Sequence, residues 1–337
     1  MEAWLYEPFK EKSVKCNLCC HRCIIKPGER GLCRVRENDN GILNTLVYGR
    51  IIASHIDPIE KKPLFHMMPG SLSFSIATVG CNFKCRFCQN ADIAQMPEDQ
   101  NGKIMGRLIK PEDVVSAAIN GNCRSISYTY TEPTVYFEFA FDTAKIAKAK
   151  GLKNVFVTNG YMSPEALRMI SPYLDGANVD LKAYNKDFYR SYCGARLEPV
   201  KETLKLMKEL GKWVEITTLL IPGLNDDPDE LARLAAFIHD ELGAETPWHI
   251  SRFHPTYRMT DKPPTPVETI VMARDIGIKS SLRYVYVGNV PGENGENTFC
   301  YSCGNLLIHR WGFSIRKNRV ENGTCPHCGV KIDGIGI

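Results

Sequence analysis

Fourteen cysteines occur in this chain of 337 residues, and their spacing is the first indication of chemistry. Twelve of them form three groups: Cys16, Cys19, Cys20, Cys23 and Cys33; Cys81, Cys85 and Cys88; and Cys300, Cys303, Cys325 and Cys328. Grouped cysteines in a reducing compartment indicate metal binding more often than disulfide bonds. We interpret the two others, Cys123 and Cys193, as small buried apolar residues.

The central group has the spacing C-x3-C-x2-C and directly follows a predicted strand over residues 71–79. Three thiolates leave one iron of a [4Fe–4S] cluster without a protein ligand. The amino and carboxylate groups of S-adenosylmethionine can bind such an open iron, and electron transfer then yields methionine and a 5′-deoxyadenosyl radical. A zinc site is the alternative, but it normally needs four protein ligands. The sequence therefore predicts Cys81, Cys85 and Cys88 as cluster ligands and catalytic residues.

With Phe87 before its last cysteine, this motif resembles the radical S-adenosylmethionine (radical SAM) superfamily. Further segments resemble pyruvate formate-lyase activating enzymes in the same order: Gln89-Asn90, Tyr130-Thr131-Glu132-Pro133, Thr158-Asn159-Gly160, Asp180-Leu181-Lys182, Ile221-Pro222-Gly223 and Phe253-His254. The resemblance implies a set of residues that contact the cofactor: Phe87, Asn90, Thr131, Glu132, Thr158, Asn159, Asp180, Lys182, Thr217 and His254.

The chain also departs from the activase pattern. Tyr130 or Thr131 stands where the cofactor-binding turn usually has its first glycine, so we expect that turn to sit differently. Val157 and Thr217 replace an Asp and an Arg. Nearly the whole chain resembles the AmmeMemoRadiSam-system radical SAM enzymes, through the N-terminal cysteines and the stretch 62–66. Cys20 stands where those enzymes usually have a proline, and His66 is interpreted as a core histidine.

The two outer groups predict further metal sites. Cys300, Cys303, Cys325 and Cys328 form two C-x2-C pairs, typical of a zinc ribbon, although the same arrangement can hold one iron. The N-terminal group offers a second set of four thiolates, and zinc is the first interpretation and an auxiliary iron–sulfur cluster the second. That set is Cys16, Cys19, Cys23 and Cys33.

Strands and helices alternate between residues 70 and 290 and must position these groups. Strands are predicted over 71–79, 125–130, 154–158, 176–181, 213–221, 248–253 and 283–287, and helices over 111–119, 134–150, 199–210, 228–242 and 266–276, with another beginning at Ser163. This order predicts an α/β fold whose parallel strands form a barrel or a partly open barrel, with the active site at the carboxyl ends of the strands. The resemblance to radical SAM enzymes implies a partial (β/α)6-type TIM barrel.

Smaller units are expected at both ends of the barrel. Residues 1–69 are predicted to form a cysteine-rich segment in which 42–48 and 51–56 pair as a hairpin. Residues 70–290 are the barrel, and residues 291–337 form a zinc-ribbon-like module that begins with a linker over 291–295. We expect the radical chemistry to lie in the barrel, so that it survives loss of the C-terminal module at least in part.

Composition is that of an ordinary globular protein, with 44% hydrophobic and 24% charged residues. We find neither a membrane-spanning stretch nor a secretory signal, and predict a cytoplasmic protein without membrane contact. The net charge of +4 is concentrated toward the two ends, which leaves nucleic-acid contact open.

Three functions compete. The activase resemblance implies radical modification of a protein substrate, with ferredoxin or flavodoxin as a typical reductant. The second is radical modification of RNA or a small molecule. The third is a metal-binding regulatory module without catalysis, which the intact cysteine motif disfavours.

Overall fold

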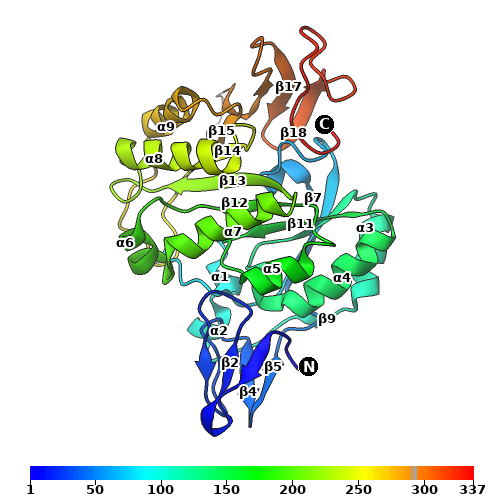
Figure 1. The fold of residues 1–337 in the computed structure, drawn as a ribbon, viewed down its shortest axis with the longest axis vertical. Helices are drawn as coiled ribbons and strands as arrows, with labels where there is room; N and C mark the ends of the chain where they lie inside the picture. Colours follow the sequence, from blue (N-terminus) through cyan, green and yellow to red (C-terminus); the bar gives the residue numbers. More distant parts are fainter. Residues whose placement is uncertain (289, 291–293) are drawn as a thin grey trace.

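A computed structural model describes residues 1–288, 290 and 294–337 (Figure 1). Most of the linker predicted over 291–295 lies outside the described residues. Within the described part of the chain, no helix combines the length and apolar character needed to cross a membrane.

The centre of the molecule is a mostly parallel sheet. Among the described residues it has eight strands in the order β15-β14-β13-β12-β11-β10-β8-β7. All neighbours from β8 to β15 are parallel, whereas β7 pairs antiparallel with β8. The strands are β7 (Ala53–Pro58), β8 (Leu72–Ala77), β10 (Ser125–Tyr128), β11 (Lys153–Thr158), β12 (Gly176–Asp180), β13 (Trp213–Leu220), β14 (Trp248–Arg252) and β15 (Val285–Gly288).

The predicted α/β class and partial barrel are confirmed. No pairing joins β7 to β15 within the described residues, so the sheet is open. Figure 1 shows helices α4, α5 and α7 along one face of the sheet. The crossover helices are α3 (Pro111–Asn120), α4 (Phe137–Ala149), α5 (Pro164–Ile170), α7 (Leu197–Glu209), α8 (Pro228–Phe237) and α9 (Val267–Lys279).

Several helices begin where the sequence predicts, because polar side chains cap them. The hydroxyl of Ser163 accepts a hydrogen bond from the amide of Ala166 at 3.2 Å, and α5 begins at the following proline. Asp227 accepts from the amide of Glu230 at 2.8 Å in front of α8. Each cap satisfies an amide that has no partner within its own helix.

The predicted hairpin between residues 42–48 and 51–56 is wrong. Strand β5 (Ile42–Thr45) pairs with β4 (Arg36–Asp39) instead, and the second segment joins the central sheet as β7. The reason is the turn at Asn40 and Gly41, which both have positive φ, of 53° and 104°. Such a turn closes a hairpin before Ile42. The central sheet therefore begins at Ala53, and the boundary at residue 70 stays a prediction.

Helix α9 also differs from its expected end at Gly277. It continues to Lys279 because the glycine serves packing rather than termination. An added Cβ at Gly277 would lie 3.0 Å from both the Trp248 ring and the side chain of Val285. The missing side chain thus lets the helix lie directly on β14 and β15.

The C-terminal module is a small antiparallel sheet of β16 (Thr298–Phe299), β17 (Leu306–Trp311) and β18 (Ser314–Asn318). Buried Arg310 fixes this sheet to the barrel, because it donates to the carbonyl oxygen of Phe65 at 2.8 Å. Its guanidinium also lies 4.3 Å from the centre of the Phe65 ring. The chain end adds a parallel bridge between Ile335 and Met67. The module is therefore joined to the segment that precedes β8.

We predict that Gly277→Ala destabilises the protein, because the new methyl group meets the Trp248 ring. Overpacking of this kind costs about 1–3 kcal/mol, while the higher helix propensity of alanine returns about 1 kcal/mol. Urea unfolding should therefore show a net loss of about 1 kcal/mol. Val271→Ala, at a partly exposed position of the same helix, is the control and should change stability by less than about 0.5 kcal/mol. A Gly277→Ala variant as stable as the parent would contradict this packing role.

Candidate active site

The predicted site residues come together in one cavity of about 1030 Å³. Its wall includes the three central cysteines and the full set of residues that the activase resemblance implies: Phe87, Asn90, Thr131, Glu132, Thr158, Asn159, Asp180, Lys182, Thr217 and His254. Most of them follow the ends of parallel strands, which meet at one edge of the sheet. The structure places these residues together, and their individual roles stay predictions.

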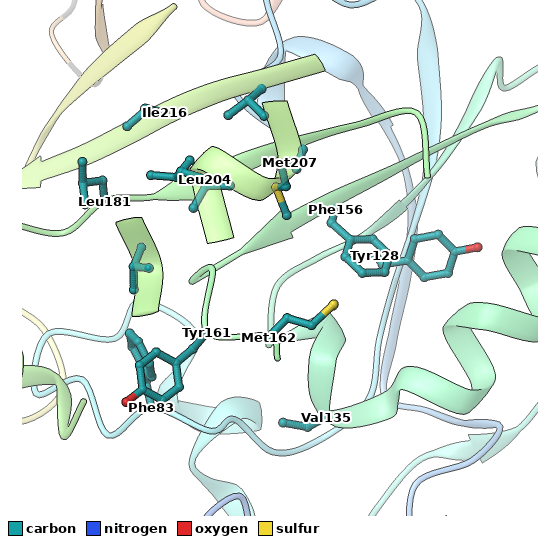
Figure 2. Close-up of a cluster of buried hydrophobic side chains, with 14 of the residues drawn as sticks. Phe83, Tyr128, Val135, Phe156, Tyr161, Met162, Leu181, Leu204, Met207 and Ile216 are labelled. Carbon is teal, nitrogen blue, oxygen red and sulfur yellow. The ribbon is translucent and has the colours of Figure 1, made fainter. Parts of the chain in front are cut away.

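The cysteine loop is fixed from behind by the hydrophobic core. Phe83 is 1% exposed, and its ring packs on Tyr161 with centroids 5.1 Å apart (Figure 2). Its carbonyl oxygen accepts from Gln95 at 2.9 Å, and the amide of Lys84 donates to the carbonyl oxygen of Cys193 at 2.8 Å. The loop that carries Cys81, Cys85 and Cys88 is thus held both by packing of Phe83 in the core and by hydrogen bonds to its backbone.

Cys85 is buried and Cys81 and Cys88 are partly buried, and this governs the ionisation of the three thiols. Burial raises the pKa of Cys81 and brings that of Cys88 to about 11. A hydrogen bond with Cys193, together with burial, raises the pKa of Cys85. A bound metal group must therefore displace protons from these thiols, as thiolate-ligated centres do.

The sulfur atoms of these three cysteines are not gathered as closely as one metal ion requires. A tetrahedral zinc holds its sulfurs roughly 3.8 Å apart. Ligands on different corners of a [4Fe–4S] cluster lie roughly 6–7 Å apart. Over the described residues, only the C-terminal cysteines form a group of three or more ligand atoms within 4.8 Å of one another. At least one pair of sulfur atoms among the central three therefore lies more than 4.8 Å apart, which a cluster allows.

Glu132 connects the ends of β10 and β11. It is 2% exposed, and Oε1 accepts from the hydroxyl of Thr158 at 2.8 Å and from the amide of Thr134 at 3.0 Å. Its Oε2 accepts from the amide of Asn159 at 2.8 Å. Burial raises the pKa of this carboxyl, and the donors act against that rise. Glu132 therefore shapes the turn that faces the cavity.

Tyr130 stands where the activase turn usually has a glycine, and its backbone conformation is one that glycine favours. Its φ is +61°, in the left-handed region that glycine favours. Its hydroxyl donates to Asp57, and the ammonium of Lys62 lies 4.6 Å from its ring. These side-chain contacts hold the backbone in an unfavourable region, so the turn keeps a glycine-like conformation without glycine.

Asn159 and the pair Asp180–Lys182 present polar groups to the cavity. The Asn159 amide donates to Oδ1 of Asn82 at 2.7 Å and lies 3.8 Å from the Cys81 sulfur. The Lys182 ammonium lies 2.9 Å from Oδ2 of Asp180, so the two side chains share one face as their alternation predicts. Together they offer hydrogen-bond and charge partners to a zwitterionic ligand.

Sequence reasoning missed a second polar region of the cavity. His249 lies 2.7 Å from the carboxylate of Glu215, which also accepts from the amides of Phe65 and His66. Burial opposes ionisation of Glu215, but the bond with His249 lowers its pKa. The sequence does contain a signal for this region, because Glu215 is a charged residue within the predicted strand over 213–221. His66 is fully buried and bonds to Tyr286 at 2.6 Å, as a core histidine.

The C-terminal module reaches the cavity, and the expectation that the radical chemistry lies in the barrel stays a prediction. Glu296 and residues 309–313, which include the turn between β17 and β18, line the wall. Trp311 and Phe313 are 62% and 49% exposed there. The open sheet leaves a side that this hairpin covers.

The C-terminal cysteines form a compact candidate metal site. The sulfurs of Cys300 and Cys328 lie 3.6 Å apart, and those of Cys303 and Cys325 lie 3.7 Å apart. Hydrogen bonds from Asn305 lower the pKa of Cys303 to about 6. This geometry fits one tetrahedral ion. Cys16, Cys19, Cys23 and Cys33 line a separate small cavity.

Comparison with known proteins identifies the superfamily. The Radical SAM superfamily model matches residues 75–235. An uncharacterised protein of Methanocaldococcus jannaschii is 52% identical over 334 residues, covering 98% of both chains. A protein of the same organism, named as a glycyl-radical enzyme activating enzyme, is 26% identical over 64% of this chain and 78% of its own.

More distant matches agree. The pyruvate formate-lyase-activating enzyme of Streptococcus mutans is 23% identical over 50% of this chain and 66% of its own. The crystal structure of Streptococcus suis SuiB bound to S-adenosylmethionine has a TM-score of 0.52 at 14% identity, covering 68% of this chain and 53% of that one, which shows the fold. With the fold, the three-cysteine loop and these relatives in agreement, the chain belongs to the radical SAM superfamily.

Proposed function

We propose that this protein cleaves S-adenosylmethionine reductively and uses the resulting radical to remove a hydrogen atom from a substrate. The observation that carries the proposal is the convergence of the three-cysteine loop and all predicted cofactor residues on one cavity. When bound, a reduced [4Fe–4S] cluster supplies the electron that splits S-adenosylmethionine into methionine and a 5′-deoxyadenosyl radical.

The residues of the chain have distinct parts in this proposal. Cys81, Cys85 and Cys88 hold the cluster. Asn159 and the Asp180–Lys182 pair bind and orient polar groups of the cofactor, as do their neighbours in the cavity wall. Glu132 positions the turn, since its oxygens accept hydrogen bonds from Thr158 at the end of β11 and from Thr134 in the turn itself. Buried walls around them keep water from the radical.

We propose a protein as the substrate, modified as activating enzymes modify theirs, with ferredoxin or flavodoxin as the reductant. The relatives named as activating enzymes support this choice. So does the exposed tip of the C-terminal hairpin, because Trp311 and Phe313 offer apolar contact area beside the cavity. The alternative substrates are RNA and a small molecule.

The first test is reconstitution of the cluster. After anaerobic treatment with iron and sulfide, Cys81→Ala, Cys85→Ala and Cys88→Ala should each lose about four irons relative to the parent, because a corner of the cluster lacks its ligand. Formation of 5′-deoxyadenosine with dithionite should fall at least about 100-fold. Cys123→Ala, away from the cavity, is the control and should keep both. Unchanged iron content in all three variants would refute the assignment and favour a regulatory module.

Cofactor binding tests the cavity wall. Asn159→Ala and Asp180→Ala should each weaken S-adenosylmethionine binding about tenfold, which corresponds to one lost polar interaction of about 1.4 kcal/mol. Calorimetry on the reconstituted protein measures this, while the iron content should remain that of the parent. Asp187→Ala removes an exposed carboxylate outside the cavity wall and should bind normally. Parental affinity in both wall variants would show that the activase resemblance does not extend to these positions.

We propose zinc for the C-terminal cysteines, because their compact spacing fits one tetrahedral ion. Cys325→Ala should remove one zinc and reduce hydrogen-exchange protection over residues 299–337, since metal supplies much of the folding free energy of so small a core. The central cluster should remain. Because the central cysteines and the predicted cofactor residues belong to the barrel, and the hairpin forms only one part of the cavity wall, we expect 5′-deoxyadenosine formation to persist in part. A complete loss of cleavage with the cluster intact would place the module in the catalytic machinery.

A further inference from the structure

A second cavity lies beside the cysteine loop and collects the N-terminal cysteines. Its wall contains four thiols, together with the polar side chains of Arg36 and Asn82 and several apolar residues. The thiols are those of Cys16, at the end of β2 (Val14–Cys16), and of Cys19, Cys23 and Cys33 in the loops that follow. The fifth cysteine of the segment, Cys20, points elsewhere and donates to the carbonyl oxygen of Met162.

The spacing of these four thiols differs from that of the C-terminal set. A zinc ion would draw its sulfurs to roughly 3.8 Å from one another. The C-terminal cysteines have that spacing, with two sulfur pairs at 3.6 and 3.7 Å. In the described chain no three of the N-terminal thiols lie within 4.8 Å of one another, although all four line one small cavity. They share this wider spacing with the central cysteines.

Three buried donors at the same cavity have no partner. Nε and Nη1 of Arg36 and Nδ2 of Asn82 are buried and make no hydrogen bond in the structure. The side chain of Arg36 is 1% exposed, and its Nη2 bonds to both oxygens of Glu138, at 2.8 and 2.6 Å. Buried donors without acceptors are costly and point to an absent acceptor. The sulfurs of a negatively charged cluster would accept from them.

We propose that Cys16, Cys19, Cys23 and Cys33 hold a second [4Fe–4S] cluster, with Arg36 and Asn82 as donors to its sulfurs. Four thiolates on four irons leave no open corner, so this cluster binds no S-adenosylmethionine. The wall of the cavity includes the apolar side chains of Leu18, Ile25 and Val135. The chemistry of this cluster is therefore electron transfer.

The position of the cavity indicates where the electron goes. Asn82 lines it and directly follows Cys81, and its carbonyl oxygen lies 2.8 Å from Nε2 of His21. The Oδ1 of Asn82 accepts from Asn159, which lies in the wall of the main cavity. A low-potential one-electron donor would reduce the N-terminal cluster, and that cluster would pass the same electron to the central one and return to its oxidised state. This relay rests on the proposed function, whereas the binding of the cluster does not.

Metal analysis of the reconstituted parent protein tests the site without any substitution. We expect about eight irons, eight sulfides and one zinc per chain. Four irons with two zinc ions would overturn the proposal in favour of an N-terminal zinc site. Four irons with one zinc would overturn it as well, because the N-terminal site would then be empty.

Variants assign the irons to their sites. Cys23→Ser should leave about four irons, and Cys20→Ser is the matched control that should keep eight. The triple variant C81A/C85A/C88A should still hold four, with the electron paramagnetic resonance spectrum of a reduced cluster that S-adenosylmethionine does not perturb. Four irons in Cys20→Ser and none in the triple variant would refute the second cluster. Eight irons in the triple variant would instead contradict the proposed central site, so the two failures are distinct.

Arg36→Lys provides an independent readout. Hydrogen bonds to cluster sulfurs favour the reduced state, so loss of the guanidinium donors should lower the reduction potential of the N-terminal cluster. Potentiometric titration of the C81A/C85A/C88A form isolates that cluster. An unchanged potential in a variant with full iron content would show that Arg36 does not donate to it.

Discussion

The buried carboxylate of Glu132 is the interaction on which the active-site geometry depends. It is held between the ends of β10 and β11, where the side chains of Thr134 and Thr158 and the amide of Asn159 all donate to it. Burial of a carboxylate without such partners would be costly. Its donors are Thr158 and Asn159 at the end of β11 and Thr134 in the turn that follows β10, so the carboxylate ties that turn to the end of β11.

The same principle joins the C-terminal module to the barrel. Arg310 is buried, lies 3.8 Å from the carboxylate of Glu60, and donates to the hydroxyl of Thr298 at 2.7 Å. Removal of one partner of such a buried pair is strongly destabilising, so the pair fixes the position of the hairpin. This position brings Trp311 and Phe313 to the open side of the sheet. If the C-terminal module were not fixed in this position, the open side of the sheet would be exposed to solvent.

The three cysteine sets of this chain differ in how closely their sulfur atoms lie. The C-terminal sulfurs are packed closely, in a module whose small core includes two of the cysteines themselves. The central and N-terminal thiols are spread around cavities that the larger core surrounds. The sulfur atoms around a single metal ion lie close together, whereas those around a cluster lie farther apart. Similar cysteine motifs can therefore bind different metal groups.

The sequence by itself determined the α/β class, the alternation of strands and helices along the chain and the convergence of the predicted cofactor residues, because parallel strands deliver the residues after their ends to one edge. Helix starts such as Ser163 were also readable, since capping is local. Tertiary structure decided that Gly277 serves packing, that β7 joins the sheet, and that Tyr130 adopts a glycine-like turn. Each of these depends on contacts between residues distant in sequence, and local pattern carries no record of such contacts.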